Sequence, residues 1–180
     1  MFVTGLNLVG FYAGWFACVV GAAHGWLALG PLVVAALVAL HVVLSPHPRR
    51  EVYLVLAAGL LGWSIDTLSA SLGIYSFGDK SFAPWLCPPW MVALWMIFAT
   101  TLNNSLAWLA PRRALAALLG GAAGPLSYYY GAKLGAIELS APAGLSLVAL
   151  AVVWAAALPG LFRLAQWINT RYPETAQAPG

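Results

Sequence analysis

The chain has 180 residues, of which 62% are hydrophobic and only 7% are charged, and its formal net charge is +3. Soluble domains carry about a quarter charged residues, and a single soluble core cannot enclose this much apolar surface. Lipid is therefore the expected solvent for most of the chain. The net charge does not indicate nucleic-acid binding, because the basic residues form small clusters at the ends of apolar stretches.

About six apolar stretches are long enough to cross the roughly 30 Å of bilayer hydrocarbon. We expect these spans at residues 2–22, 27–44, 52–73, 89–109, 113–134 and 144–167. Breaks such as "SPHPRRE" and "APRR" separate them, because proline cannot continue a helix. The prediction is an all-α, polytopic transmembrane helical bundle that forms one domain over residues 1–170. A polar, disordered cytoplasmic tail is expected at 171–180.

The basic residues predict the orientation of the bundle. Six arginines fall in the even-numbered loops or near the C-terminus, whereas Lys80 and Lys133 fall on the other side. Positively charged residues stay in the cytoplasm, so both termini are expected to be cytoplasmic. The outer side receives the long loop at 74–89, whose aromatic residues suit an interfacial belt. A re-entrant segment is the alternative interpretation of this loop.

Asp66 is the only acidic residue placed well inside a predicted span. Its neighbours on the helix are small, and a face of small residues packs closely against other helices or lines a cavity. They are Gly59, Gly62, Ser69, Ala70 and Gly73. An ionised acid at mid-bilayer costs about 2.5–3.5 kcal/mol, so Asp66 needs a partner, water or a proton. A functional acid and a structural acid bonded to hydroxyls or backbone are both open interpretations.

Two residues of the span at 113–134 complete a candidate polar site on the outer side with Asp66. Tyr128 lies on a glycine-rich face and needs a partner for its hydroxyl group. Lys133 ends this span on the outer side. It either pairs with Asp66, which offsets both charges, or extends alone to the lipid headgroups.

The stretch "ATTLNNSLAW" at 99–108 places five polar residues among the six from Thr100 to Ser105 in the fourth predicted span. Thr100, Asn103 and Asn104 share a helix face, at the depth of Asn7 in the first span. In lipid these amides must find protein partners. They form a candidate inner polar site with two interpretations. Either they join the first and fourth spans, or they line a pocket for a headgroup or a small solute.

Patterns of established catalytic and metal sites are missing from the sequence. No spacing of His, Cys and carboxylate residues resembles a zinc, haem or di-iron site, and there is no phosphate loop or nucleophile elbow. We therefore expect no cofactor and no metal ion. An ordinary enzyme is disfavoured, because a single buried acid does not make an acid/base pair.

Four blocks of the sequence carry a resemblance to a known family. They are "GWFACVVGAA", "LGWSIDTLSASLG", "PPWMVALWMIFATTLNNSLAWL" and "GGAAGPLSYYYGAKLGAIE". Together they resemble the bacterial inner-membrane family named domain of unknown function 2878, over roughly residues 5–165. The resemblance implies a short multi-pass protein of the bacterial inner membrane, and it brings no established activity and no catalytic residues. It also implies an association with fatty-acid modification, including cyclopropane synthase-like enzymes.

Three functional hypotheses follow from the sequence. The first is a lipid-associated accessory or scaffold subunit linked to membrane-lipid modification. The second is a small-solute or lipid transporter that uses Asp66 and Lys133. The third is an intramembrane enzyme that acts on acyl chains, with Asp66 or Tyr128 as the acid or base. The expected partners are the lipid bilayer and either a membrane protein or a second copy of the chain, and no nucleic acid is expected.

Overall fold

The computed structural model describes residues 2–172, and it describes side chains from Gly5 onward. This part of the chain is folded almost entirely into helices, as predicted. The α-helices are α1 (Phe2–Ala23), α2 (Leu29–Leu44), α3 (Pro48–Ser71), α4 (Pro89–Leu102), α5 (Arg113–Lys133) and α6 (Ala143–Arg171). Two short strands, β1 (Tyr75–Ser76) and β2 (Glu138–Leu139), pair antiparallel, and 3-10 helices form at Gly78–Lys80 and Ala107–Leu109.

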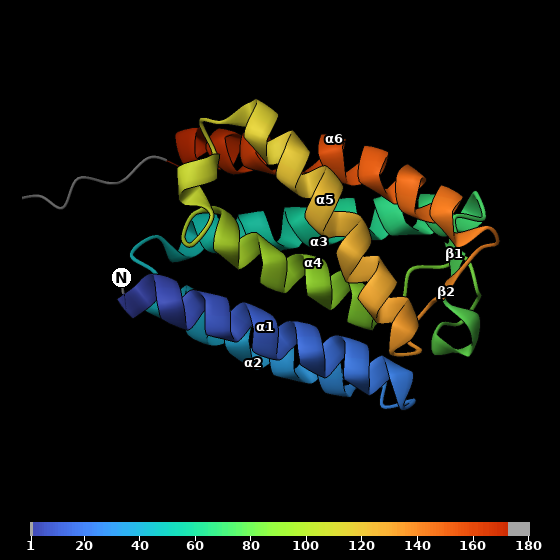
Figure 1. Ribbon diagram of the computed structural model, residues 1–180. Helices are drawn as coiled ribbons and strands as arrows, with labels where there is room; N and C mark the ends of the chain where they lie inside the picture. The colour runs from blue at the N-terminus through green and yellow to red at the C-terminus, as the bar shows by residue number, and fades with distance from the viewer. Residues whose placement is uncertain (1, 173–180) are drawn as a thin grey trace, which may run out of the picture.

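The helices form a bundle in which α4 is central (Figure 1). The helix α4 packs against α1, α2, α3 and α6, while α5 packs mainly on α6. Figure 1 shows the hairpin of α1 and α2 on one side of the bundle and α5 with α6 on the other. The strands β1 and β2 lie at one end, and the start of α1 and the last described turn of α6 lie at the opposite end.

Three helices are long and apolar enough to cross a membrane, which supports the prediction of a membrane protein. The segments are Gly5–Ala23 in α1, Pro48–Ser71 in α3 and Ala143–Arg171 in α6. The helices α2 and α4 are apolar but shorter. With 14 residues, α4 extends only about 21 Å at 1.5 Å per residue, less than the thickness of bilayer hydrocarbon. The predicted count of six spans is therefore not established by helix length.

The prediction that the fourth span continues to residue 109 was wrong, because α4 ends at Leu102. Its own polar side chains compete with the helix for backbone groups. The hydroxyls of Thr100 and Thr101 donate to the carbonyls of Ile97 and Phe98, at 2.8 and 2.6 Å. The amide of Asn104 donates to the Thr100 carbonyl at 2.9 Å. The chain then turns and continues into the 3-10 helix.

The described part of the chain ends within the first residues of the predicted C-terminal tail at 171–180. The helix α6 continues to Arg171, and Arg50 donates from Nε to the carbonyl of Tyr172 at 2.5 Å. The rest of the predicted tail, residues 173–180, lies outside the described residues. Both cysteines, Cys18 and Cys87, are buried, and they do not form a disulfide.

Candidate functional site

Asp66 is fully buried and accepts hydrogen bonds from three side chains of different elements. The hydroxyl of Tyr75, in β1, donates to Oδ1 at 2.7 Å, and that of Tyr128, in α5, donates to the same oxygen at 2.5 Å. The indole Nε1 of Trp95, in α4, donates to Oδ2 at 2.7 Å. Asp66 therefore connects α3 to α4, to α5 and to the strand that follows α3.

Trp95 also stacks on Trp154 of α6, with the ring centroids 4.7 Å apart and the ring planes within 12° of each other. Glycines on both sides make room for this pair. A Cβ on Gly62 of α3 would lie 2.0 Å from Cγ of Trp95, and one on Gly124 of α5 would lie 2.2 Å from Cγ of Trp154. The small-residue face predicted around Asp66 is thus a packing face. The buried Nε1 of Trp154 approaches the Tyr128 hydroxyl without completing a hydrogen bond.

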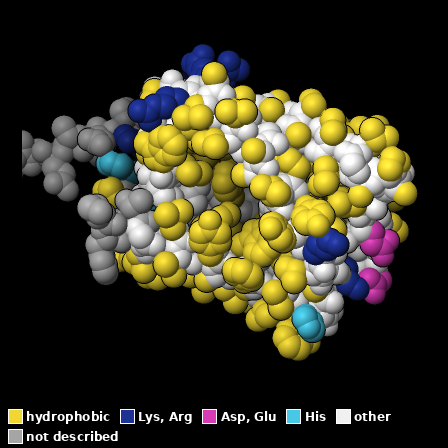
Figure 2. Space-filling model, in the orientation of Figure 1, with side chains coloured by type: hydrophobic (Ala, Val, Ile, Leu, Met, Phe, Trp, Pro, Cys, Tyr) yellow, Lys and Arg dark blue, Asp and Glu magenta, His cyan; other side chains and the backbone are white. Residues whose placement is uncertain are grey.

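The tryptophan pair and Tyr128 form part of the wall of a large apolar crevice between α1 and α5, with α4 as its floor. The crevice has a volume of about 860 Å³. Figure 2 shows the surface hollowed here, with hydrophobic side chains around the opening. Asp66 itself lines neither this crevice nor the smaller cavity described below. Side chains that line the crevice include Phe11, Trp15, Leu94, Phe98, Leu119 and Leu126.

A single described hydrogen bond joins the two sides of the crevice. Trp15 of α1 donates from Nε1 to the hydroxyl oxygen of Ser127 of α5 at 2.9 Å. Both residues line the crevice, and the two helices otherwise make few contacts with each other. The crevice therefore lies where the α1–α2 hairpin and the α5–α6 pair diverge on either side of α4.

The predicted outer site is brought together in part. Asp66 and Tyr128 are in direct contact, but Lys133 forms no ion pair with Asp66. Its ammonium lies 5.5 Å from the centroid of the Tyr129 ring, and the residue is exposed at the last position of α5. The geometry therefore favours the second interpretation of Lys133, in which its side chain extends outward and does not pair with Asp66.

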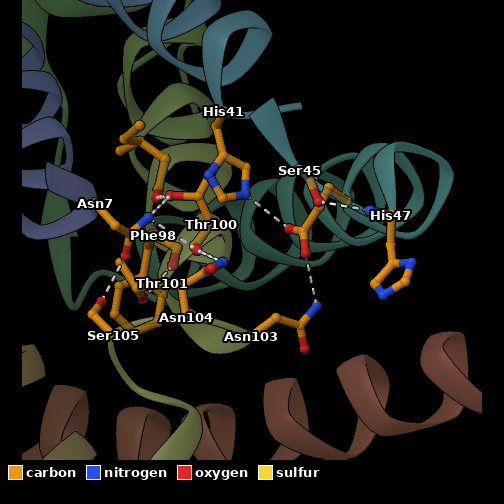
Figure 3. A network of polar contacts seen from close by, with 12 residues as sticks. Asn7, His41, Ser45, His47, Phe98, Thr100, Thr101, Asn103, Asn104 and Ser105 are labelled. Atoms are coloured by element: carbon orange, nitrogen blue, oxygen red, sulfur yellow. Dashed lines mark hydrogen bonds and ion pairs between the residues drawn. The ribbon is translucent and has the colours of Figure 1, made fainter. Parts of the chain in front are cut away.

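The predicted inner site divides into two networks, shown in Figure 3. In the first, Nδ2 of Asn7 lies 3.2 Å from the carbonyl oxygen of Thr100 and 3.3 Å from its hydroxyl oxygen. The hydroxyl of Ser105 donates to Oδ1 of Asn7 at 2.7 Å. Asn104 caps the end of its own helix instead of reaching α1. This network joins α1 to the end of α4, as the first interpretation of the polar stretch expected.

Asn103 belongs to the second network, which the sequence did not predict. Its Nδ2 donates to Oε1 of the buried Glu51 at 3.2 Å, and its Oδ1 accepts from Nδ2 of Asn169 at 3.0 Å. Nε2 of His41 lies 3.0 Å from Oε2 of Glu51. The network thus connects α2, α3, the end of α4 and α6.

One signal in the sequence was available for the contact between His41 and Glu51. The helices α2 and α3 form a hairpin with a three-residue connection at 45–47, and the hairpin brings residues equally distant from its centre to the same level. His41 and Glu51 are each five positions from Pro46. Applied to the connection "SPH", this symmetry would have predicted the contact.

A smaller cavity of about 370 Å³ lies beside this second network, at the arginine-rich end of the bundle. Its lining is more polar than that of the crevice and comes from the hairpin connection, the end of α4 and the last turns of α6. The side chains include Ser45, Arg50, Glu51, Asn103, Asn104, Gln166 and Asn169. Within residues 2–172, no group of three or more His, Cys, Asp or Glu residues is placed to hold a metal ion.

Comparison of the sequence with protein-family models gives a match over most of the chain. Residues 4–160 match the model of the family described as protein of unknown function (DUF2878). The chain belongs to this family. No curated protein and no solved structure matches the chain.

Membership of DUF2878 confirms the resemblance found in the sequence blocks, and the match covers nearly all of the bundle. The matched region begins in α1 and ends within α6, so it includes both polar networks except for Asn169. The family description carries no activity. What this DUF2878 protein can bind therefore depends on its own crevice, networks and charges.

Proposed function

We propose that this DUF2878 protein is a multi-pass protein of the bacterial inner membrane that binds the hydrocarbon chain of a membrane lipid in the crevice between α1 and α5. The observation that carries the proposal is the crevice itself. Its volume of about 860 Å³ lies within the range of about 300–1,000 Å³ typical of ligand pockets, and its lining is largely apolar and aromatic.

A bound chain is held there by packing, because the surrounding lipid is as apolar as the crevice and offers no hydrophobic gain. Each pair of carbon atoms in contact contributes only about 0.1–0.2 kcal/mol, but a chain makes dozens of such contacts. The Asp66 hydrogen bonds hold Trp95 and Tyr128 in fixed positions in or beside the wall. A fixed wall supports binding, because little ordering is needed when the chain enters.

This proposal develops the hypothesis of a lipid-associated accessory protein, and its link to membrane-lipid modification remains part of the proposal. The transporter and enzyme hypotheses both require Asp66 to meet a substrate. Asp66 is fully buried, lines neither cavity, and has both carboxylate oxygens occupied by donors. Those contacts favour a structural role for Asp66 and so favour lipid binding over the other two hypotheses.

Two neighbouring alanines of α5 give a matched test. Ala123 lines the crevice, whereas Ala122 is exposed on the same helix but does not line it. We expect Ala123→Phe to fill part of the crevice and displace about ten chain contacts. That loss of about 1–2 kcal/mol corresponds to a five- to thirtyfold decrease in affinity. Ala122→Phe should bind lipid like the wild type.

Native mass spectrometry of the protein extracted in mild detergent measures the amount of lipid retained by each variant. Equal retention in Ala123→Phe and the wild type would contradict the proposal. The proposal would also be contradicted if the wild type carried no lipid but bound a second copy of the chain or a partner protein, and Ala123→Phe lost that protein. The crevice would then be a protein interface.

A further inference from the structure

The crevice is apolar along most of its length, but one end differs in charge. Lys133 is the one charged residue among the described residues that line it. Lys133 is also the last residue of α5, five positions and about 7.5 Å beyond Tyr128 along the helix axis. In the other direction the lining continues through Leu119 and Leu109 without a charged group. The crevice therefore has one cationic end and one apolar end.

The ammonium of Lys133 is free to meet a ligand. It forms no ion pair with any described carboxylate, and its described contact is with the Tyr129 ring, at 5.5 Å. The other lysine at this end of the bundle differs, because Lys80 pairs with the adjacent Asp79 and does not line the crevice. Figure 2 shows a basic side chain beside the hollow, at the end away from the arginine-rich end.

We infer that the occupant of the crevice is an anionic phospholipid from the leaflet at the β1–β2 end of the bundle, with its phosphate group at Lys133 and one acyl chain along the crevice toward Leu109. This inference rests on the proposed function and adds the class and orientation of the lipid. A phospholipid carries its charge at one end of its chains, which matches the single charge at one end of the crevice. A lysine close to an anionic lipid headgroup strengthens binding about fivefold.

Two lipids with the same acyl chains and different headgroups separate the contribution of Lys133 to lipid affinity from the contribution of the acyl chain. The full-length protein in mild detergent is titrated with dioleoyl phosphatidylglycerol, which is anionic, and with dioleoyl phosphatidylcholine, which is zwitterionic. Native mass spectrometry gives the affinity for each lipid. We expect the wild type to bind the anionic lipid about fivefold more tightly.

We expect Lys133→Gln to remove this preference by weakening only the binding of phosphatidylglycerol, and Lys133→Arg to retain it. Lys80→Gln is the matched control, because it removes a lysine from the same end of the bundle but outside the crevice. It should retain the preference. Equal affinity of the wild type for the two lipids, or an unchanged preference in Lys133→Gln, would overturn the inference.

The variant Ala123→Phe distinguishes failure of this inference from failure of the proposed function. If Ala123→Phe weakens the binding of both lipids while the wild type shows no preference between them, only the headgroup assignment fails. If Ala123→Phe binds both lipids like the wild type, the crevice is not the binding site and both proposals fail.

Discussion

At the scale of single residues, the structure gives Asp66 a clear physical role. Its two oxygens accept from two tyrosine hydroxyls and one indole. Without the carboxylate, the Tyr128 hydroxyl and the Trp95 indole would be buried donors without a partner. A buried donor that loses its acceptor costs about 1–3 kcal/mol. The carboxylate of Asp66 thus stabilises the packing of α3 against α4, α5 and β1, because it accepts hydrogen bonds from all three.

Replacing Asp66 with alanine should therefore destabilise the protein more than any other exchange of an acidic residue at the β1–β2 end of the bundle. Tyr128 and Trp95 would lose their acceptor, whereas the Tyr75 hydroxyl keeps the backbone carbonyl of residue 66 within reach. We therefore expect the free energy of unfolding to fall by at least about 2 kcal/mol. Titration with sodium dodecyl sulfate, followed by circular dichroism, measures this free energy. Asp79→Ala is the control, because Asp79 is exposed and its surface pair with Lys80 contributes little. Equal stability of both variants would refute this role.

At the scale of elements, small residues determine how closely the helices approach. The Trp95–Trp154 stack fits between helices because Gly62 and Gly124 have no side chain where the indole rings lie. Trp95 then reaches Asp66 and also lines the crevice. The shape of the crevice wall therefore depends on Gly124, which lines the crevice, and also on Gly62, which does not.

Two glycines one turn apart on α3 test this dependence. A Cβ on Gly62 would meet the indole of Trp95 at 2.0 Å, whereas the closest atom to one on Gly59 would be in the flexible side chain of Met96, at 3.0 Å. We expect Gly62→Ala to lower the free energy of unfolding by about 1–3 kcal/mol through overpacking. Gly59→Ala should be near neutral, because the higher helix propensity of alanine offsets a small shift of Met96. The detergent titration described above measures both variants, and similar losses in the two would contradict the prediction.

At the scale of the whole molecule, the two ends of the bundle differ in charge. The connections after α2 and α4 and the last turns of α6 lie at one end, and they carry the arginines. The strands β1 and β2 and Lys80 lie at the other end. Because positively charged residues stay in the cytoplasm, we propose that the arginine-rich end is cytoplasmic. Both ends of the described chain lie on that side, and the polar networks around Asn7 and Glu51 lie there as well.

Single cysteines report this orientation. Cys18 and Cys87 are buried, so they should give little background labelling. Phe82, which is 94% exposed in the loop after β1, and Arg112, which is exposed before α5, are suitable positions. Intact spheroplasts treated with a membrane-impermeant maleimide should label Phe82→Cys at once and Arg112→Cys only after lysis. Labelling of both positions in intact spheroplasts would contradict the proposed orientation.

Much of the fold was predictable from local patterns. Apolar stretches, proline-containing breaks and small-residue faces act over one or two helix turns, so they located the six helices and the packing face around Asp66. The end of α4 was missed, because apolar residues resume at 106–109 beyond the polar stretch and extend the predicted span. Only the competition of Thr100, Thr101 and Asn104 for backbone groups shows where the helix stops.

The sequence by itself determined that this is a helical membrane protein with an acid that needs partners, because composition and helical spacing depend on the chain alone. The tertiary structure decided which partners Asp66 has, why Asn103 turns to Glu51, and that α1 and α5 diverge to leave a crevice. Those features depend on how helices distant in the sequence rotate and approach one another. Such arrangements are set by the packing of all the helices together and not by the spacing within any one of them.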